Sequence, residues 1–323
     1  MGLTIEQIDS ALDSFTEWLS NPNIVGLYVG TKTVNDKETE DLAIIVDVIQ
    51  KKTPEALTED DIRIPSYIEI KVPTFKAGSL TYRTEKIPTD VVEVGEIIDE
   101  DELFTDVEET PPETIEDDTQ KVRPCPGGLF IQTEGLHVRG TLGVNTIYKG
   151  GYRLISNNHV ISKNGSVGQM IHQPTPPRPG RELVEVTGFI SIQYYSNPNQ
   201  PNPVFNINDV AWADANQSQC SSSIQDIGTP AGFDQPRVGE TVKKRGAKTA
   251  SVLSAKIRSV NYRYRSRNRS ANLYSWWKNG ILLDQYISAP GDSGAAYLSN
   301  DLKIVGLHRS GSSRNNRSIG APL

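Results

Sequence analysis

The chain has 323 residues, of which 23% are charged and 36% hydrophobic, and its formal net charge is −7. This length allows two domains with cores of their own, and the charged and hydrophobic fractions are typical of a soluble globular protein. The acidic balance argues against a general nucleic-acid binder. No stretch is apolar and long enough to cross a membrane, so we expect no membrane contact.

Residues 1–98 predict a small α+β domain. Thr4 and Gln7 have the spacing of a capping box, and apolar residues recur at helical spacing up to Leu19. Alternating or apolar runs at 24–30, 42–49, 67–72 and 88–94 predict strands. No catalytic grouping occurs here. Regulation, oligomerisation and substrate recruitment all stay open as roles for this domain.

The next segment, residues 99–121, is strongly acidic. It carries no basic residue before Lys121, and its acids are Asp99, Glu100, Asp101, Glu102, Asp106, Glu108, Glu109, Glu113, Glu116, Asp117 and Asp118. With two prolines in its middle it can bury little apolar surface. We therefore expect a solvated linker before a second domain at residues 122–323.

Three polar residues in the second domain suggest nucleophilic catalysis. His159 follows an apolar strand-like run, and Asp209 opens another after a loop rich in proline and asparagine. Ser293 lies between glycines, so the amides of Gly291 and Ser293 could point together at a developing oxyanion. A serine hydroxyl needs a base and a carboxylate that orients the base, and His159 and Asp209 supply these two groups.

Each residue also has an ordinary interpretation. Gly, Asp and Ser are common in turns, a histidine can simply close a strand, and Asp214 is a rival for the acid. His137 and His172 have no acid or cysteine cluster nearby, so we expect both at the surface. No grouping has metal-ligand spacing, and no cofactor is predicted.

The motifs around His159, Asp209 and Ser293, in that order, resemble the trypsin-like serine proteases of the chymotrypsin fold. More narrowly, 123–128, the run ending at His159 and 238–246 are similar to bacterial relatives of the plant narrow-leaf protease. The resemblance implies a mainly β protein with a double β-barrel over 122–323. It also implies a hydrolase with His159 as base, Asp209 as its partner, Ser293 as nucleophile, and the Gly291 and Ser293 amides as oxyanion hole.

The sequence after Ser293 bears on specificity. Residues 305–311 resemble the matching segment of glutamyl endopeptidases, in which a histidine binds an acidic side chain with help from a hydroxyl residue. His308 and Ser288 occupy such places, and Arg309 would add attraction. We predict a preference for Glu or Asp before the scissile bond; cleavage after small or apolar residues is the alternative.

Residues 241–283 carry many bases and no acid. Tyrosine and arginine alternate from Tyr262 to Arg265, which puts the arginines on one face of a strand. A solvated face is favoured over a ligand surface. If the face has a partner, the acidic linker or an acidic substrate comes before nucleic acid.

An acid-preferring site beside an acidic linker suggests that the enzyme cuts its own linker, or that the linker lies in the cleft as a brake. The alternative function is an inactive protease-fold binding module. The chain shows no signal-peptide pattern, so a cytoplasmic protein is expected. Cys125 and Cys220 could form one bridge, but free thiols are favoured in that compartment. The sequence leaves oligomerisation open.

Overall fold

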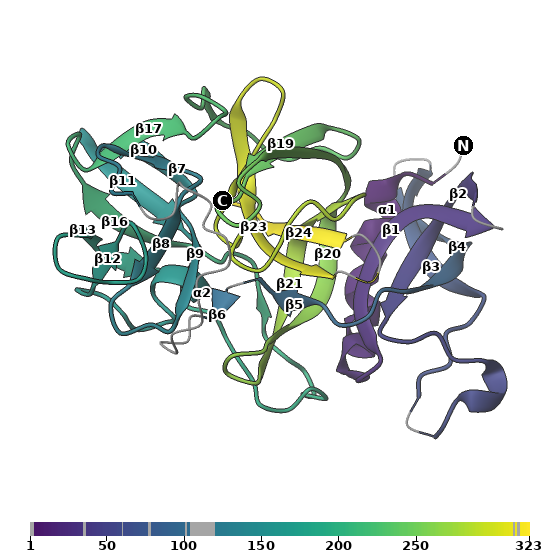
Figure 1. The fold of residues 1–323 in the computed structure, drawn as a ribbon. Helices are drawn as coiled ribbons and strands as arrows, with labels where there is room; N and C mark the ends of the chain where they lie inside the picture. Colours follow the sequence, from purple (N-terminus) through teal and green to yellow (C-terminus); the bar gives the residue numbers. More distant parts are fainter. Residues whose placement is uncertain are drawn as a thin grey trace.

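The computed structural model describes residues 3–34, 37–59, 61–76, 79–100, 102–103, 120–312, 314 and 317–323. Most of the predicted linker acids lie outside the described residues: Asp101, Asp106, Glu108, Glu109, Glu113, Glu116, Asp117 and Asp118. The described chain forms three parts, with the second barrel between the N-terminal domain and the first barrel (Figure 1).

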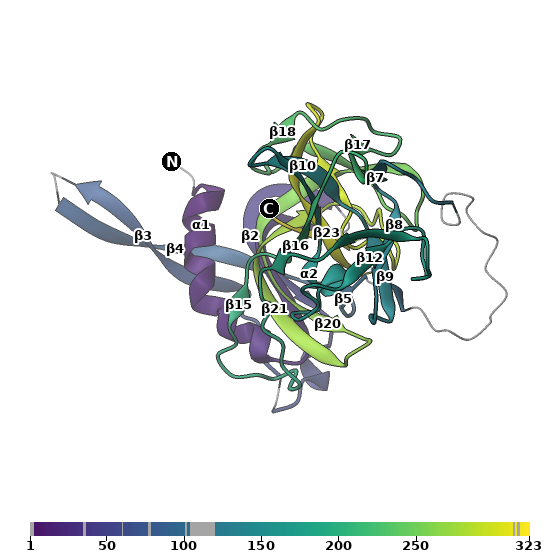
Figure 2. The ribbon, with the colours of Figure 1, turned by 90° about the vertical axis from the view of Figure 1, so that its left-hand side faces the viewer.

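The N-terminal domain combines one amphipathic helix with a curved sheet. Its elements are α1 (Ile5–Leu12), the 3-10 helices η1 (Asp13–Ser20) and η2 (Pro54–Ala56), and the strands β1 (Ile24–Val34), β2 (Lys37–Val48), β3 (Tyr67–Lys76) and β4 (Ser79–Glu93). The predicted capping box is confirmed: Thr4 and Gln7 exchange backbone-to-side-chain hydrogen bonds of 3.1 and 3.3 Å. The β3–β4 hairpin extends away from the body (Figure 2).

The first barrel is built from short strands around a core that includes Leu142, Leu154 and Ile171. Its elements are β7 (Cys125–Gly127), β8 (Phe130–Thr133), β9 (Val138–Thr141), β10 (Val144–Tyr148), β11 (Gly151–Ser156), α2 (Asn158–Ile161), β12 (Met170–His172), β13 (Glu182–Glu185), β14 (Gly188–Phe189), β16 (Ala211–Ala215) and β17 (Cys220–Ile224). His137 is exposed as predicted. The surface prediction for His172 is wrong, because β12 carries its side chain into the interior.

The second barrel contains the longest strands. They are β15 (Phe205–Asn206), β18 (Gly232–Phe233), β19 (Thr241–Arg245), β20 (Val252–Asn268), β21 (Leu273–Leu283), β22 (Ala296–Leu298), β23 (Lys303–Ser312) and β24 (Arg317–Ala321). One continuous sheet runs from β15 through β21, β24, β23, β22, β19 and β20, and then into β1, β2, β4 and β3 of the N-terminal domain. The fold is therefore the expected mainly β double barrel with a small α+β domain in front of it.

The two domains share a buried interface at β20. Gly26 and Leu27 of β1 pair with Tyr264 and Arg263, and a Cβ on Gly26 would overlap the Tyr262 ring, so only glycine allows this approach. The Tyr262 hydroxyl donates a 2.8 Å hydrogen bond to Asp47 of β2. The N-terminal domain is thus joined to the second barrel by backbone hydrogen bonds as well as by side-chain contacts.

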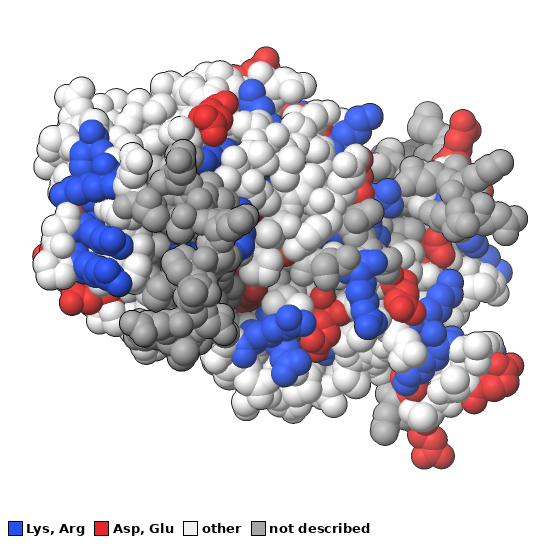
Figure 3. Space-filling view, in the orientation of Figure 1, with Lys and Arg blue, Asp and Glu red and all other residues white. Residues whose placement is uncertain are grey.

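The arginines of β20 alternate with the tyrosines as predicted, but the predicted solvated face is wrong. Arg263 forms ion pairs of 2.9 Å with Asp9 and Asp13, and Arg265 donates to backbone carbonyls at Asn21 and Pro22. Both arginines are buried because the N-terminal domain covers this face. Elsewhere, on the face in Figure 3, basic side chains lie in separate groups with acids between them.

The chain leaves β4 and runs into the space between the barrels. Glu96 pairs with Arg267 at 3.1 Å, and β5 (Ile98–Asp99) then pairs with both β20 and β23. Beyond it, β6 (Glu102–Leu103) pairs with β9 of the first barrel (Figure 1). The predicted linker therefore begins as ordered chain. Asp99 and Glu100 are 3% and 4% exposed, so the expectation of a solvated segment is wrong for them.

The two cysteines lie opposite each other in the neighbouring strands β7 and β17, and both are free thiols. Burial raises the pKa of Cys125 and of Cys220 to about 12. Neither thiol is ionised near neutral pH, so neither has the reactivity of a catalytic cysteine.

Candidate active site

The Gly291–Gly294 loop between β21 and β22 is shaped by its glycines. Gly291 and Gly294 have φ values of 108° and 98°, a region that favours glycine. A Cβ on Gly294 would overlap the Thr141 carbonyl and the Ser156 hydroxyl. The loop is consequently packed against the first barrel, and Ser293 sits at the junction of the two barrels.

Asp292 anchors this loop from inside the second barrel. Its Oδ2 lies 2.6 Å from Nζ of Lys244, and both side chains are fully buried. Its Oδ1 accepts hydrogen bonds from the amides of Lys248 and Thr249 at 2.9 and 3.0 Å. Although burial by itself raises the pKa of Asp292, the charge of Lys244 and these bonds hold it below 3.8. An internal lysine thus fixes the backbone that carries Gly291 and Ser293.

His159 and Asp209 are in direct contact, whereas Asp214, the rival acid, does not contact His159. His159 is the second residue of the buried turn α2, and its Nδ1 lies 2.5 Å from Oδ2 of Asp209. Oδ1 of Asp209 accepts a 3.2 Å hydrogen bond from the His159 amide. Asp214 pairs instead with Arg153 on an exposed edge. A carboxylate on Nδ1 leaves Nε2 as the nitrogen able to take a proton.

The charges around His159 favour its protonated form. Burial alone lowers the pKa of His159, but the charge and hydrogen bond of Asp209, together with Asp99, raise it above 6.5, while Arg309 opposes them. Burial also raises the pKa of Asp209, yet His159 and Arg309 hold it below 3.8. Asp209 is therefore an anion beside a histidine that gains a proton readily.

The Ser293 hydroxyl donates a 2.8 Å hydrogen bond to the backbone carbonyl of Arg309. Nε2 of His159 is buried and has no hydrogen-bond partner among the described residues. The Ser293 hydroxyl is thus held by a backbone carbonyl, and Nε2 of His159 is left without a donor among the described residues.

The backbone carbonyl of Glu100 lies at the two amides of the loop, those of Gly291 and Ser293. Its carbonyl oxygen accepts the Gly291 amide at 2.7 Å and the Ser293 amide at 3.4 Å, while its own amide donates to the Arg309 carbonyl at 3.1 Å. Two converging amides are the geometry that stabilises a developing oxyanion. The carbonyl that they hold belongs to the chain itself.

The Glu100 side chain fills a pocket formed by His308, Tyr286 and Gly311, which we call the glutamate pocket. Its Oε2 lies 2.6 Å from Nε2 of His308, and its Oε1 accepts a 2.7 Å hydrogen bond from Tyr286. A Cβ on Gly311 would overlap Oε1 and the Tyr286 ring. Gly311 therefore makes the space in which the carboxylate lies.

The hydrogen bonds of His308 define its tautomer. Nδ1 lies 2.7 Å from the Tyr297 hydroxyl, and Nε2 faces a carboxylate, which only accepts. Nε2 therefore carries the proton, and Nδ1 accepts from Tyr297. Burial lowers the pKa of His308, with Glu100 opposing this only in part. A neutral histidine is the donor that this pocket provides.

The structure separates the other two predicted pocket residues from Glu100. The Ser288 hydroxyl lies 2.9 Å from that of Ser318, so the hydroxyl that holds the carboxylate is Tyr286. Arg309 follows His308 in β23, and successive strand residues point to opposite faces. Its guanidinium lies against Asp99 and Asp209 at 2.7 and 2.9 Å rather than against the carboxylate of Glu100, so the attraction that we expect between Arg309 and the pocket carboxylate stays a prediction.

Comparison with protein families matches a family model described as Trypsin to residues 146–322, more than half of the chain. The chain belongs to the trypsin family. Its matched part includes His159, Asp209 and Ser293. No curated protein matches the chain.

Among solved structures, this trypsin-family chain is similar to a glutamic acid specific serine protease, which is described as using a novel histidine triad in substrate binding (19% identity, TM-score 0.44). It is also similar to protease A of Thermobifida fusca (16%, 0.42) and to an alpha-lytic protease homolog, N4 (16%, 0.43). Each comparison covers 61% of this chain, and 93%, 90% and 92% of the respective partner.

Several residues of this trypsin-family site are not predicted by the sequence patterns. Glu100 belongs to a run of acids that differ little in local pattern, and Lys244 lies among other bases. Tyr286 stands only two residues before Ser288, and its hydroxyl is the sequence signal that indicates a second donor for the pocket. Gly311 follows the His308 segment, but its role depends on Glu100, 211 residues earlier in the chain.

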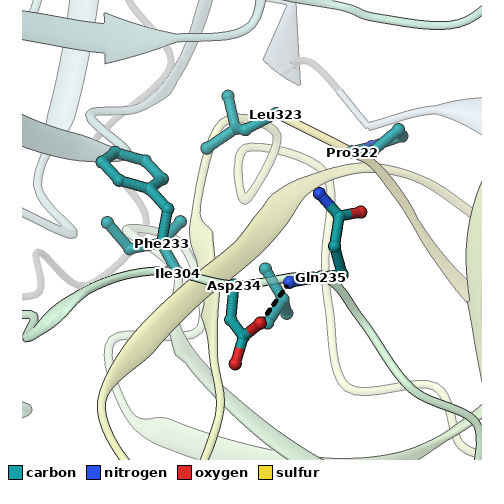
Figure 4. Close-up of a pocket in the computed structure, with 7 residues that line it drawn as sticks. Phe233, Asp234, Gln235, Ile304, Pro322 and Leu323 are labelled. Atoms are coloured by element: carbon teal, nitrogen blue, oxygen red, sulfur yellow. Dashed lines mark hydrogen bonds between the residues drawn. The ribbon is translucent and has the colours of Figure 1, made fainter.

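Other features of the described residues lie apart from this site. No cluster of three metal-binding side chains occurs among them, and none of their helices is long and apolar enough to span a membrane. A shallow pocket between β18 and the C-terminus is lined by Phe233, Ile304, Pro322 and Leu323 (Figure 4). Asp234 also lines this pocket, where it accepts the Gln235 amide and pairs with Arg237 and Lys303.

Proposed function

We propose that this member of the trypsin family is a serine endopeptidase that cuts peptide chains after glutamate. Ser293 is the nucleophile, His159 the base and Asp209 its orienting partner. The observation that carries the proposal is Glu100, whose carbonyl lies on the Gly291 and Ser293 amides while its carboxylate lies in the glutamate pocket. The narrower resemblance to the narrow-leaf relatives, and the cytoplasmic location, stay predictions.

The reaction follows from these positions. The Ser293 oxygen forms a bond to the carbonyl carbon, its proton passes to Nε2 of His159, and the two loop amides hold the oxyanion. The carbon–nitrogen bond then breaks as His159 gives the proton to the leaving amine. Water attacks the resulting ester with His159 again as base, which releases a carboxylate and restores Ser293.

We also propose that the first substrate is the protein's own linker, cut after Glu100. Ile98 and Asp99 pair with Gly311 and Ser310 of β23, and the chain continues onto β9 beyond Glu100. The interface at β20 keeps this segment beside the cleft before and after cleavage, at a high effective concentration. A substrate in trans must displace it, so the segment acts as a brake.

Peptides that differ only before the scissile bond test the glutamate preference. We expect glutamate to be cut faster than glutamine by a factor of about 10 to about 100, because the amide replaces a charged acceptor with a neutral one and turns a donor toward His308 or Tyr286. Initial rates by chromatography measure kcat/KM for each peptide. Faster cleavage of the glutamine or of an apolar peptide contradicts the proposal.

A variant of the pocket gives the matched control. His308→Gln should remove most of the preference for glutamate over glutamine, whereas His137→Gln, at an exposed position, should leave it within about twofold. A fluorophosphonate probe separates an enzyme from an inactive binding module: labelling that Ser293→Ala abolishes supports an enzyme, and an unlabelled chain that also leaves its linker intact supports the module.

The pH profile should follow His159, which must be neutral to accept the Ser293 proton. Because Asp209 and Asp99 raise the pKa of His159 against burial and Arg309, we expect cleavage after Glu100 to become faster with rising pH, with a midpoint above 6.5. Asp99→Asn removes one of these acids and should move the midpoint to lower pH. Rates of self-cleavage from about pH 5 to about pH 9 measure both midpoints; a midpoint below 6.5 would exclude this account.

A further inference from the structure

Arg309 holds a second acidic residue of the bound segment. Its Nη1 lies 2.7 Å from Oδ1 of Asp99, and its Nη2 donates a 3.0 Å hydrogen bond to Oδ2. Both side chains are fully buried. Two parallel contacts between a guanidinium and a carboxylate are the strong and directional form of this pair.

The surroundings of Arg309 keep its guanidinium in place. It stacks over the Trp277 ring at 3.8 Å, and Nη1 donates to the hydroxyls of Ser266 and Ser310 at 2.9 and 2.6 Å. Its Nε lies 2.9 Å from Oδ2 of Asp209. The guanidinium is therefore fixed with one edge toward Asp209 and the other toward the residue that precedes the glutamate.

The net charge of the cluster formed by Asp99, Asp209, Arg309 and His159 reaches zero only during the reaction. Asp99, Asp209 and Arg309 together carry one net negative charge while His159 is neutral. When His159 takes the Ser293 proton, the four groups sum to zero, and the negative charge left by this transfer develops on the substrate oxygen at the two loop amides. An acid at the place of Asp99 therefore stabilises the transition state more than the bound substrate, and such an interaction raises kcat.

We propose that Arg309 forms an acid-binding subsite for the second residue before the scissile bond, so that the preferred substrates carry aspartate followed by glutamate. The inference rests on the proposed function and names its substrate class. It gives Arg309 a role in substrate recognition distinct from that of His308, on the opposite face of the same strand.

A competition between two peptides tests the proposal on the full chain. One peptide carries Ile-Asp-Glu before the scissile bond and the other Ile-Asn-Glu, and both are present in one vessel. Their relative depletion gives the ratio of kcat/KM, because occupancy of the cleft by the protein's own segment slows both equally. We expect the aspartate peptide to be preferred by at least about tenfold. At saturation the difference should appear in kcat.

A control pair carries Asp or Asn one residue before the isoleucine, and its two peptides should differ by less than about threefold. In Arg309→Met the aspartate preference should be lost. Because that variant leaves Asp209 without its guanidinium and could fail to fold, a second measurement follows self-cleavage of the full chain. Asp99→Asn should slow it by at least about tenfold, whereas Glu96→Gln, at a part-exposed pair, should not.

The outcomes separate the two proposals. Equal depletion of the aspartate and asparagine peptides, with glutamate still preferred over glutamine, overturns the subsite and leaves the proposed function standing. A preference that resides in KM alone overturns the charge balance with His159. If neither any peptide nor the linker is cut, the proposed function fails and the subsite fails with it.

Discussion

Ser293→Ala should leave the chain in one piece, while the unaltered protein is cut after Glu100. We expect the rate of this cleavage to fall by about 10⁵-fold or more, because the variant lacks the atom that forms the bond to the Glu100 carbonyl. The measurement is the intact mass of the denatured protein over time. Under native conditions the two fragments should stay together, since β1 remains paired with β20.

Ser270→Ala provides the matched control, because Ser270 is an exposed serine in the turn between β20 and β21 and should leave cleavage unchanged. Cleavage at the same rate in Ser293→Ala would show that another protease cuts the linker. An unaltered chain that stays whole, but cuts glutamate peptides, would contradict self-processing alone.

Lys244→Met should have the largest effect on stability. The substitution leaves Asp292 as a buried carboxylate without its cation, and breaking a buried ion pair in this way costs about 3 to about 5 kcal/mol. Asp292 anchors the loop that carries the Gly291 and Ser293 amides, so probe labelling of Ser293 should fall as well. Urea unfolding measures the first effect, and the labelling rate of the folded variant measures the second.

Lys243→Met is the control, because the neighbouring side chain is part-exposed and points to the other face of β19. It should change the free energy of unfolding by less than about 0.5 kcal/mol. If the two lysine variants are equally stable, the Lys244–Asp292 pair does not anchor the loop.

Several elements were predictable because their signals are local. The capping box of Thr4 and Gln7 spans four residues, the glycines around Ser293 define their own turn, and the tyrosines of β20 alternate with a strand's period. The resemblance to trypsin-like proteases, rather than these patterns, implied the fold class and made His159 and Asp209 partners, and the structure places these two residues in contact.

Burial was harder to predict, because it depends on which surfaces meet. The sequence pattern predicts a solvated face for Arg263 and Arg265, but the N-terminal domain packs on β20 and buries both side chains. The acidic composition of residues 99–121 predicts a solvated linker that begins at Asp99 and Glu100, because composition describes the segment as a whole and not its single residues. Each of the four side chains is buried with a specific partner.

Sequence patterns and the family resemblance were enough to predict the mainly β architecture, the order of His159, Asp209 and Ser293, and a histidine where an acid could bind. Which segment of the chain lies in the site depends on the tertiary structure. Glu100 meets His308 across 208 residues, and Asp99 meets Arg309 across 210. No local pattern encodes such pairs, because they form only when the shared β1–β20 sheet and the β5–β23 pairing bring distant segments together.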